Sequence, residues 1–196
     1  MITVCFDLET LPCSDPALIA EIEESVKPPK TLKKAESIAA WWSEEGEQAK
    51  KDAVHRTGLD GSYGRILAIG FAIDHLEPFC IIDADEKKVI NEFYRILNNA
   101  INVEYEYGFA TSEVMFVGHN ITGFDLRFLY QRSVVNGIKP PKYIPFQAKP
   151  WDKQVFDTMT AWNPDREKRT SLDRLCKILG VESPKADMDG SQVAQA

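Results

Sequence analysis

The sequence VCFDLET contains two carboxylates, Asp7 and Glu9, in a segment typical of a first, buried strand. Side chains two positions apart on a strand point to the same face, whereas Val4, Phe6 and Leu8 would point to the other face and into the core. Neighbouring carboxylates repel each other, and burial raises that cost. A divalent cation such as Mg²⁺ or Mn²⁺ would remove the conflict. The alternative is a strand end that reaches solvent, where both acids are hydrated.

A second group of polar residues lies in VGHNITGFDLRFL, where a strand predicted at 113–120 is followed directly by a helix. Asn120 is placed to cap that helix. Asp125 would lie in its first turns, where the positive helix end stabilises a carboxylate. Such strand-to-helix junctions are where open α/β sheets place their sites. Asp125 could also be an ordinary first-turn acid, and for His119 a structural hydrogen bond is the favoured interpretation.

A third acid, Asp157, ends the short apolar run of VFDTM. It could be a metal ligand, or it could hydrogen-bond to the start of a turn. The structural role is favoured.

Strands and helices that would position these acids alternate along the chain. Strands are predicted at 1–10, 65–73, 77–85 and 113–120, with a fifth strand or extended segment at 154–162. Helices are predicted at about 15–26, 32–54, 86–103, 122–136 and 171–180, the last with Ser171 as N-cap and Gly180 as its end. The first three strands fit an antiparallel meander. This order predicts an α/β fold with a mixed sheet flanked by helices. The helical stretch at about 14–60 reads as an insertion after the first strand.

The composition fits one globular domain over residues 1–196, with 44% hydrophobic residues and a net charge of −7. Nothing global therefore indicates nucleic-acid binding. Residues 127–153 differ, because they hold a local excess of basic residues. This basic segment contains Arg127, Arg132, Lys139, Lys142, Lys149 and Lys153 against the single acid Asp152. It is either a solvated face or the wall of a groove for a phosphate backbone.

Aromatic residues suggest two further contacts. Tyr143 and Trp151 lie within the basic segment and could stack on bases, although core packing is favoured for Trp151. Trp41 and Trp42 are adjacent on a predicted helix, so they cannot both face the same way. We expect one of them to pack and the other to be exposed.

Cysteine usage and hydropathy indicate a cytoplasmic protein. Cys5, Cys80 and Cys176 lie in apolar runs and are predicted to be buried thiols, and no spacing indicates a zinc site or a disulfide framework. The chain begins with a strand-like run rather than a signal peptide. No apolar stretch approaches the roughly 20 residues of a membrane helix, so no membrane contact is expected.

The segments FDLET and HNITGFDLRFL together resemble the DEDD superfamily of 3′–5′ exonucleases, which has a ribonuclease H-like fold. The first motif of that superfamily is D-x-E after a strand. Its second is an Asn, two or three residues, an aromatic and an Asp, matched here by Asn120, Phe124 and Asp125. The closest resemblance is to predicted exonucleases similar to the proofreading domain of family-B DNA polymerases. The segments TGLDGSYGRILAIGFA, VFDTM, SLDRLCKILG and KADMDGSQV also resemble this group. The resemblance therefore covers nearly the whole chain, and it is weakest over the helical insertion.

The resemblance implies hydrolysis of a terminal phosphodiester of DNA with two Mg²⁺ or Mn²⁺ ions. Asp7 would bridge both ions, Glu9 would hold the first, and Asp125 would hold the second, directly or through water. The substrate would be nucleic acid, expected to be single-stranded or frayed DNA 3′ ends.

The resemblance also implies contacts to the substrate. Thr10 and Leu11 would touch the terminal nucleotide, and Asn120 would contact backbone or sugar. Phe124 would pack beneath the site.

The third motif of the superfamily carries a last metal-binding Asp with a Tyr or His four or five residues earlier. Neither spacing follows Asp157, and Asp173, Asp187 and Asp189 lack such a partner. We expect the sequence to be shortened before the helix that carries this motif; loss of the fourth ligand is the alternative. The chain would then bind its first metal weakly and hydrolyse slowly or not at all. A non-catalytic nucleic-acid-binding module and a small-phosphoester metallohydrolase are the rival functions.

Overall fold

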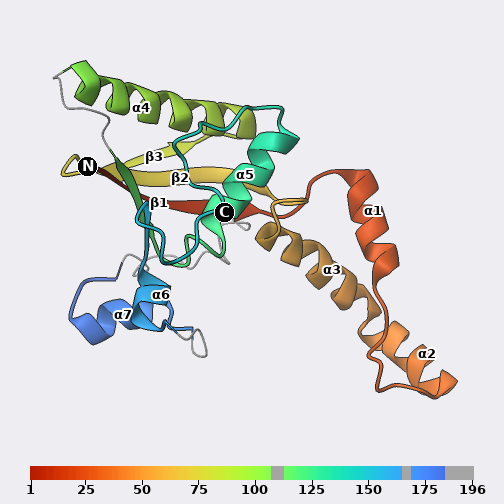
Figure 1. The fold of residues 1–196 in the computed structure, drawn as a ribbon. Coiled ribbons are helices and arrows are strands. Elements are labelled where there is room, and N and C mark those ends of the chain that lie inside the picture. Colours follow the sequence, from red (N-terminus) through yellow and green to blue (C-terminus); the bar gives the residue numbers. More distant parts are fainter. Residues whose placement is uncertain (107–112, 165–168, 184–196) are drawn as a thin grey trace.

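The computed structural model describes residues 1–106, 113–164 and 169–183, and its five strands form one mixed sheet (Figure 1). The strand order is β3-β2-β1-β4-β5. β1 pairs antiparallel with β2 and β2 with β3, whereas β4 pairs parallel with β1 and β5 with β4. The predicted meander and the mixed α/β sheet are confirmed. The strands are β1 (Ile2–Leu11), β2 (Arg65–Ile73), β3 (Phe79–Ile82), β4 (Val114–Gly118) and β5 (Val155–Asp157).

The last strand differs from the prediction. β5 ends at Asp157, and α6 (Thr158–Trp162) follows where a strand or extended segment was expected. The Asp157 carboxylate accepts hydrogen bonds from the backbone N–H groups of Met159 and Thr160, which caps α6 and ends the strand.

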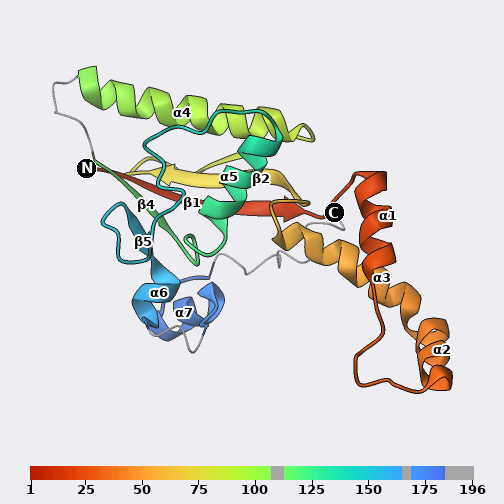
Figure 2. The same ribbon diagram turned by 45° about the vertical axis from the view of Figure 1, so that its right-hand side comes forward.

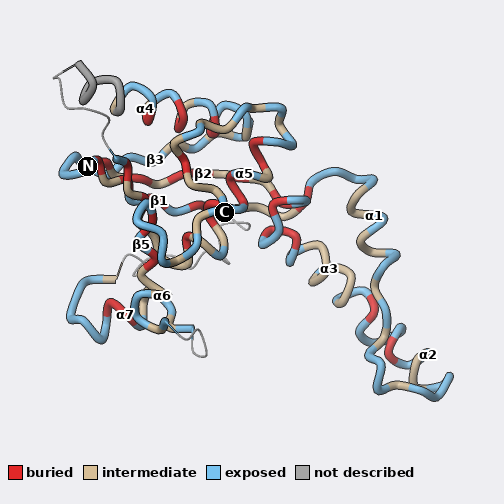
Figure 3. Tube along the Cα trace, in the orientation of Figure 1, coloured by how far each residue is buried: buried red, intermediate tan, exposed pale blue. Residues whose placement is uncertain are grey.

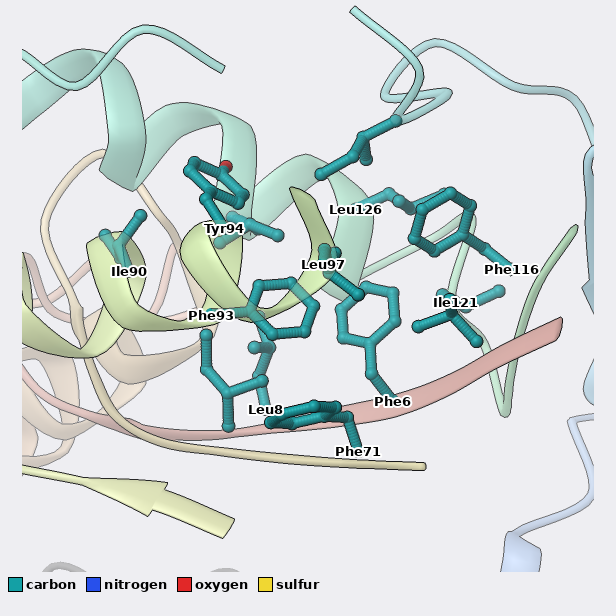
Figure 4. Packing of buried hydrophobic residues seen from close by; sticks show 14 of the residues in the cluster. Phe6, Leu8, Phe71, Ile90, Phe93, Tyr94, Leu97, Phe116, Ile121 and Leu126 are labelled. Atoms are coloured by element: carbon teal, nitrogen blue, oxygen red, sulfur yellow. The ribbon is translucent and has the colours of Figure 1, made fainter. Parts of the chain in front are cut away.

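One face of the sheet is covered by α4 (Glu86–Glu106) and α5 (Asp125–Val135), and the core lies between these helices and the sheet. Figure 4 shows aromatic rings from both layers meeting there. The Phe93 ring on α4 lies 5.6 Å from the Phe6 ring and 5.2 Å from the Phe71 ring, measured between centroids. Phe6 also meets Phe116 of β4 at 6.1 Å. These contacts fix which face of β1 is buried.

The opposite sheet face carries two thiols that were predicted to be buried. Cys5 and Cys80 are exposed, while Cys176 is buried as predicted. Cys80 pairs with Gly70, and Gly70 pairs with Asp7, so these residues share a face. An apolar sequence environment does not distinguish the two faces of a strand, which is why the prediction for Cys5 and Cys80 was wrong.

A helical arm, residues 14–59, leaves the body of the molecule after β1 and returns before β2 (Figures 1 and 2). It contains α1 (Pro16–Ser25), α2 (Ala35–Glu44), α3 (Gly46–Arg56) and the 3₁₀ turn η1 (Thr57–Leu59). Figure 3 shows mostly exposed or intermediate residues along it. At its root, the Cys13 N–H donates to the Thr57 hydroxyl at 2.8 Å. The predicted insertion is therefore a separate projection.

The prediction of one helix over 32–54 was wrong, because the helix breaks between α2 and α3. The break falls at Glu45 and Gly46, and glycine is a poor helix former. The Trp42 ring fills the space a Cβ at Gly46 would need, with the nearest ring atom at 2.6 Å. Trp41 is 8% exposed and Trp42 39%, so one is buried and the other is exposed, as expected.

The helix α7 (Leu172–Leu179) has the predicted ends: the Ser171 hydroxyl accepts from the Arg174 N–H, and Gly180 adopts a positive φ of 67°. Among the described residues, no helix is both long and apolar enough to cross a membrane.

Candidate active site

Asp7 lies on the open face of the central strand β1. Its neighbours Phe6 and Leu8 are buried on the other face, as the alternation predicts, while Asp7 itself is exposed. Opposite Asp7 on β2 is Gly70, and a Cβ built there would meet no heavy atom within 4 Å. The Asp7 carboxylate is therefore accessible to an ion and to a substrate.

Asp125 approaches β1 from the start of α5 and is only 2% exposed. β4 pairs with β1 only as far as Cys5, so the Leu8 N–H beyond that point is available, and it donates to Asp125 Oδ1 at 3.1 Å. Burial first, then the negative charge of Asp7 and, more weakly, that of Asp157 raise the pKa of Asp125, while the Leu8 N–H lowers it, and the resulting pKa is about 8. Asp125 and Asp7 thus lie close enough to repel each other.

Glu9 is half-buried at the irregularity that separates it from Thr10 in the β1–β2 register. Within the described ranges, no three His, Cys, Asp or Glu side chains gather closely enough to hold a metal ion. The structure therefore brings Asp7 and Asp125 together, and Glu9 lies two residues beyond Asp7 on the same strand. Two carboxylates do fit one Mg²⁺, which proteins hold with one or two carboxylates together with water and substrate phosphates.

Asp157 is 2% exposed, and both of its oxygens accept hydrogen bonds from protein groups. Oδ1 accepts from the N–H groups of Asn120 at 3.0 Å and Met159 at 3.1 Å. Oδ2 accepts from the Thr122 N–H at 3.1 Å and its hydroxyl at 2.6 Å. The carboxylate therefore joins the β4–α5 loop to α6, which is the structural role favoured from the sequence.

His119 also makes structural contacts. A carbonyl only accepts, so Nε2 donates to the Thr170 carbonyl oxygen at 2.9 Å. Nδ1 lies 2.9 Å from the Thr158 hydroxyl oxygen. The imidazole thus joins the end of β4 to α6 and to the segment before α7.

Asn120 does not cap α5, and that prediction was wrong. The N-cap residue of α5 is Phe124, which forms no side-chain cap bond. Asn120 instead adopts a positive φ of 64°, and its carbonyl accepts from the N–H groups of Gly123 and Phe124 at 2.9 Å each. Its side-chain amide lies against Gly123, where any Cβ would collide with Asn120 Oδ1.

The remaining predicted substrate residues lie at the ends of β1 and α5. The Thr10 hydroxyl donates to the Gly58 carbonyl at 2.7 Å, which ties β1 to the root of the arm. Leu11 pairs with Arg65 on β2. Phe124 packs its ring 5.2 Å from that of Phe128 and against the core.

Two hollows flank Gly123. The first, which we call the α6 hollow, has a volume of about 220 Å³ and lies between the 120–123 loop, residues 148–150, α6 and Arg169. The second, of about 210 Å³, lies between residues 59–61 of the arm root and the first turns of α5, including Arg127. Gly123 lines both hollows, so the loop of residues 120–123 separates them.

The basic segment does not form one surface. Arg132 is 8% exposed and forms a bidentate ion pair with Glu86, at 2.9 and 2.8 Å, so it cannot line a groove. Lys149 lines the α6 hollow, and Arg127 the second hollow. Trp151 is 78% exposed, so the expectation of core packing was wrong.

Sequence reasoning missed Asn163 and Arg169 in the α6 hollow. No motif marks these two residues. Their only signal was position after Asp157 in an irregular, polar stretch. The predicted segment KADMDGSQV, with Asp187 and Asp189, lies outside the described residues.

The strand order and the flanking helices define the class: this is the ribonuclease H-like α/β fold of polymerase-B exonuclease domains. The likeness extends to the solved structure of the family B DNA polymerase from the hyperthermophilic archaeon Pyrobaculum calidifontis, with a TM-score of 0.50 and 15% identity. The match covers 100% of this chain and 20% of the polymerase chain, so the chain spans only a fifth of its length. At this identity the likeness shows the fold alone.

The family follows from the sequence match. Residues 62–196 match the model of a family described as predicted 3′–5′ exonucleases related to the exonuclease domain of PolB, and the chain belongs to this family. An uncharacterized protein of Methanocaldococcus jannaschii, MJ0365, is 28% identical over 142 residues, which is 72% of either chain. Membership supports a nuclease function in general, and with it nucleic-acid binding.

Proposed function

We propose that this protein is a metal-dependent 3′–5′ exonuclease that hydrolyses terminal phosphodiesters of DNA. The observation that carries the proposal is the Asp7–Asp125 pair, one acid open to solvent on β1 and the other buried against the β1 backbone. The family supports the reaction class, and the pair supplies the residues for it.

The pair explains why a cation is needed. Burial and the Asp7 charge both favour the protonated form of Asp125 at neutral pH. A divalent cation between the two carboxylates would remove both penalties and displace that proton. Oxygen-only donors suit Mg²⁺ or Mn²⁺. Glu9 is proposed to hold the other ion, the first of the two, which would share Asp7 and take its remaining ligands from water and substrate phosphate.

Divalent ions held by these acids would lower the pKa of a water molecule and would neutralise the charge that develops on the leaving 3′ oxygen. The protein's own residues would hold these ions and orient the DNA end. Asp7 faces the open side of the sheet, where the end of a DNA strand can enter, and Thr10 and Leu11 lie further along β1, at the arm root. Asn120 is proposed to contact backbone or sugar, and Phe124 to support the loop that carries it. A cytoplasmic location is part of the proposal, and four free cysteines are consistent with it.

The test follows a single-stranded DNA oligonucleotide labelled at its 5′ end, incubated with the protein and Mn²⁺. We expect a ladder that shortens from the 3′ end. Asp7→Asn and Asp125→Asn should slow it at least about 100-fold, the size of effect when one electrostatic stabiliser of the transition state is removed. Glu24→Gln, an exposed acid on the arm, is the matched control and should leave the rate unchanged.

Other outcomes separate the rival functions. Salt-sensitive DNA binding without any shortening would replace the proposal with a non-catalytic binding module. Hydrolysis of a small phosphoester but not of DNA would replace it with a metallohydrolase. Shortening that survives Asp7→Asn would exclude this pair as the site.

A further inference from the structure

The lining of the α6 hollow contains both polar and apolar residues. Lys149 and Arg169 bring two exposed cations to its rim, and among the described residues that line it there is no acid. Asn163 is held in place because its side-chain N–H donates to the Thr170 hydroxyl at 2.9 Å. Pro150 and Met159 supply apolar surface. Such a hollow suits a ligand that combines an anion with a flat, partly apolar group.

Trp151 directly follows Pro150 of the hollow and is 78% exposed. A tryptophan that is so exposed contributes little to the core, whereas its indole ring offers a face on which a base can stack. Stacking on such a ring tolerates every base, because every base has a π-face. The rim cations and the ring together match the two parts of a nucleotide.

The hollow adjoins the candidate active site through shared residues. Asp157 accepts hydrogen bonds from Asn120 and Thr122, both of which line the hollow. The same loop is tied to the first turn of α5, which carries Asp125, because the Leu126 N–H donates to the Ile121 carbonyl at 3.1 Å. A DNA strand whose end lies at Asp7 and Asp125 can therefore reach the hollow along the loop of residues 120–123, which leads into α5.

We propose that the α6 hollow binds a nucleotide of single-stranded DNA on the 5′ side of the terminal one, with Lys149 and Arg169 on its phosphates and Trp151 stacked on its base. The inference rests on the proposed function, because it assumes that the 3′ end lies at the acids. It assigns the polarity of the strand: the end is at Asp7, and the preceding nucleotides run toward α6.

The test measures binding of a 5′-labelled single-stranded oligothymidylate by fluorescence anisotropy in EDTA, where no strand is cut. Trp151→Ala should weaken binding about 10-fold, within the range for loss of one base stack. Lys149→Glu with Arg169→Glu should weaken it as well and reduce the slope of log K against log salt by about 1.4, roughly 0.7 per lost phosphate contact. Trp42→Ala and the pair Lys33→Glu with Lys34→Glu, all on the arm, are matched controls and should bind like the wild type.

A second probe isolates the stacking. With an abasic oligonucleotide of the same length, Trp151→Ala should bind like the wild type, whereas the double charge reversal should still weaken binding. Melting temperatures equal to that of the wild type establish that the variants are folded. Trp151→Ala and double-reversal variants that bind oligothymidylate with wild-type affinity and salt slope would overturn the inference.

The two proposals fail in different ways. If the hollow variants bind normally while Asp7-dependent shortening persists, the hollow inference is wrong and the exonuclease proposal stands. If they lose binding while the wild type cuts no DNA with Mn²⁺, the exonuclease proposal fails and the hollow remains a nucleic-acid site. A wild type that binds no single-stranded DNA overturns the inference outright.

Discussion

Asp125 is buried at the start of α5, where it accepts a hydrogen bond from the β1 backbone and lies near the Asp7 carboxylate. Its pKa rises from 3.8 to about 8, so the folded protein holds a proton there that the unfolded chain has already lost. Between these two values, folding stability contributed by this group falls as pH rises, at about 1.4 kcal/mol per pH unit. The contribution is fully present below pH 3.8 and is lost by about pH 8.

Asp125→Asn should therefore stabilise the metal-free protein at pH 8 and lose that advantage as pH falls toward 5. The amide cannot ionise, while its oxygen can still accept from the Leu8 N–H. Urea unfolding of both proteins at several pH values in EDTA measures the difference. A difference that stays constant across this range would show that Asp125 ionises normally in the folded state.

Arg132 and Glu86 act at the scale of elements, because their ion pair joins α5 to the start of α4. The side chains of both are 10% exposed. Glu86 also accepts from the Ile66 N–H of β2 at 2.6 Å and the Asn136 side chain at 2.7 Å. The pair therefore positions the helix that carries Asp125 relative to the sheet.

Arg132→Met should lower the free energy of unfolding by about 3–5 kcal/mol, because it leaves the Glu86 carboxylate buried without its cation. Arg95→Met, which removes the partner of Glu92 on the exposed side of α4, is the control and should change it by less than about 1 kcal/mol. Urea unfolding at neutral pH gives both values. Equal changes in the free energy of unfolding for the two variants would show that the buried ion pair stabilises the fold no more than the exposed pair does.

Elements with a regular hydrophobic pattern could be predicted from the sequence, and contacts between distant residues could not. The alternation of apolar and polar residues in β1 indicated its buried face. The uniformly apolar run of β2 indicated its bounds but not which of its faces is buried. Arg132 looked like one more surface cation, since its partner Glu86 is 46 residues away. Trp151 lies in an irregular segment, where no periodicity distinguishes a buried ring from an exposed one.

For the candidate site, too, the acids could be predicted from the sequence, and the hydrogen bonds between distant segments could not. Asp7 and Asp125 were found because motifs mark them, and their proximity follows from the parallel pairing of β1 and β4. The use of both Asp157 oxygens in hydrogen bonds depends on the folds of the β4–α5 loop and α6, which the sequence alone does not specify.

At the scale of the whole molecule, the arm stands apart from the body in sequence and in space. The family match begins at residue 62, after the arm has ended. α1 contains no buried residue, and the two ends of the arm meet at Cys13 and Thr57. The body should therefore fold without it.

Replacing residues 14–56 with a short Gly-Ser linker should leave a folded protein with an unchanged sheet signal in circular dichroism. Its melting temperature should stay within about 5 °C of the wild type, since an effect near 1 kcal/mol shifts a domain of this size by a few degrees. Loss of the cooperative transition would show that the arm is part of the folding unit.

The most direct test of the account is calorimetric titration of the wild type with Mn²⁺ at pH 7, repeated in buffers of different ionisation enthalpy. The account predicts that Mn²⁺ binds with release of about one proton, from Asp125. It also predicts that Asp7→Asn weakens binding at least about 10-fold, while Glu24→Gln does not. Wild-type protein that binds Mn²⁺ no better than Asp7→Asn would contradict it.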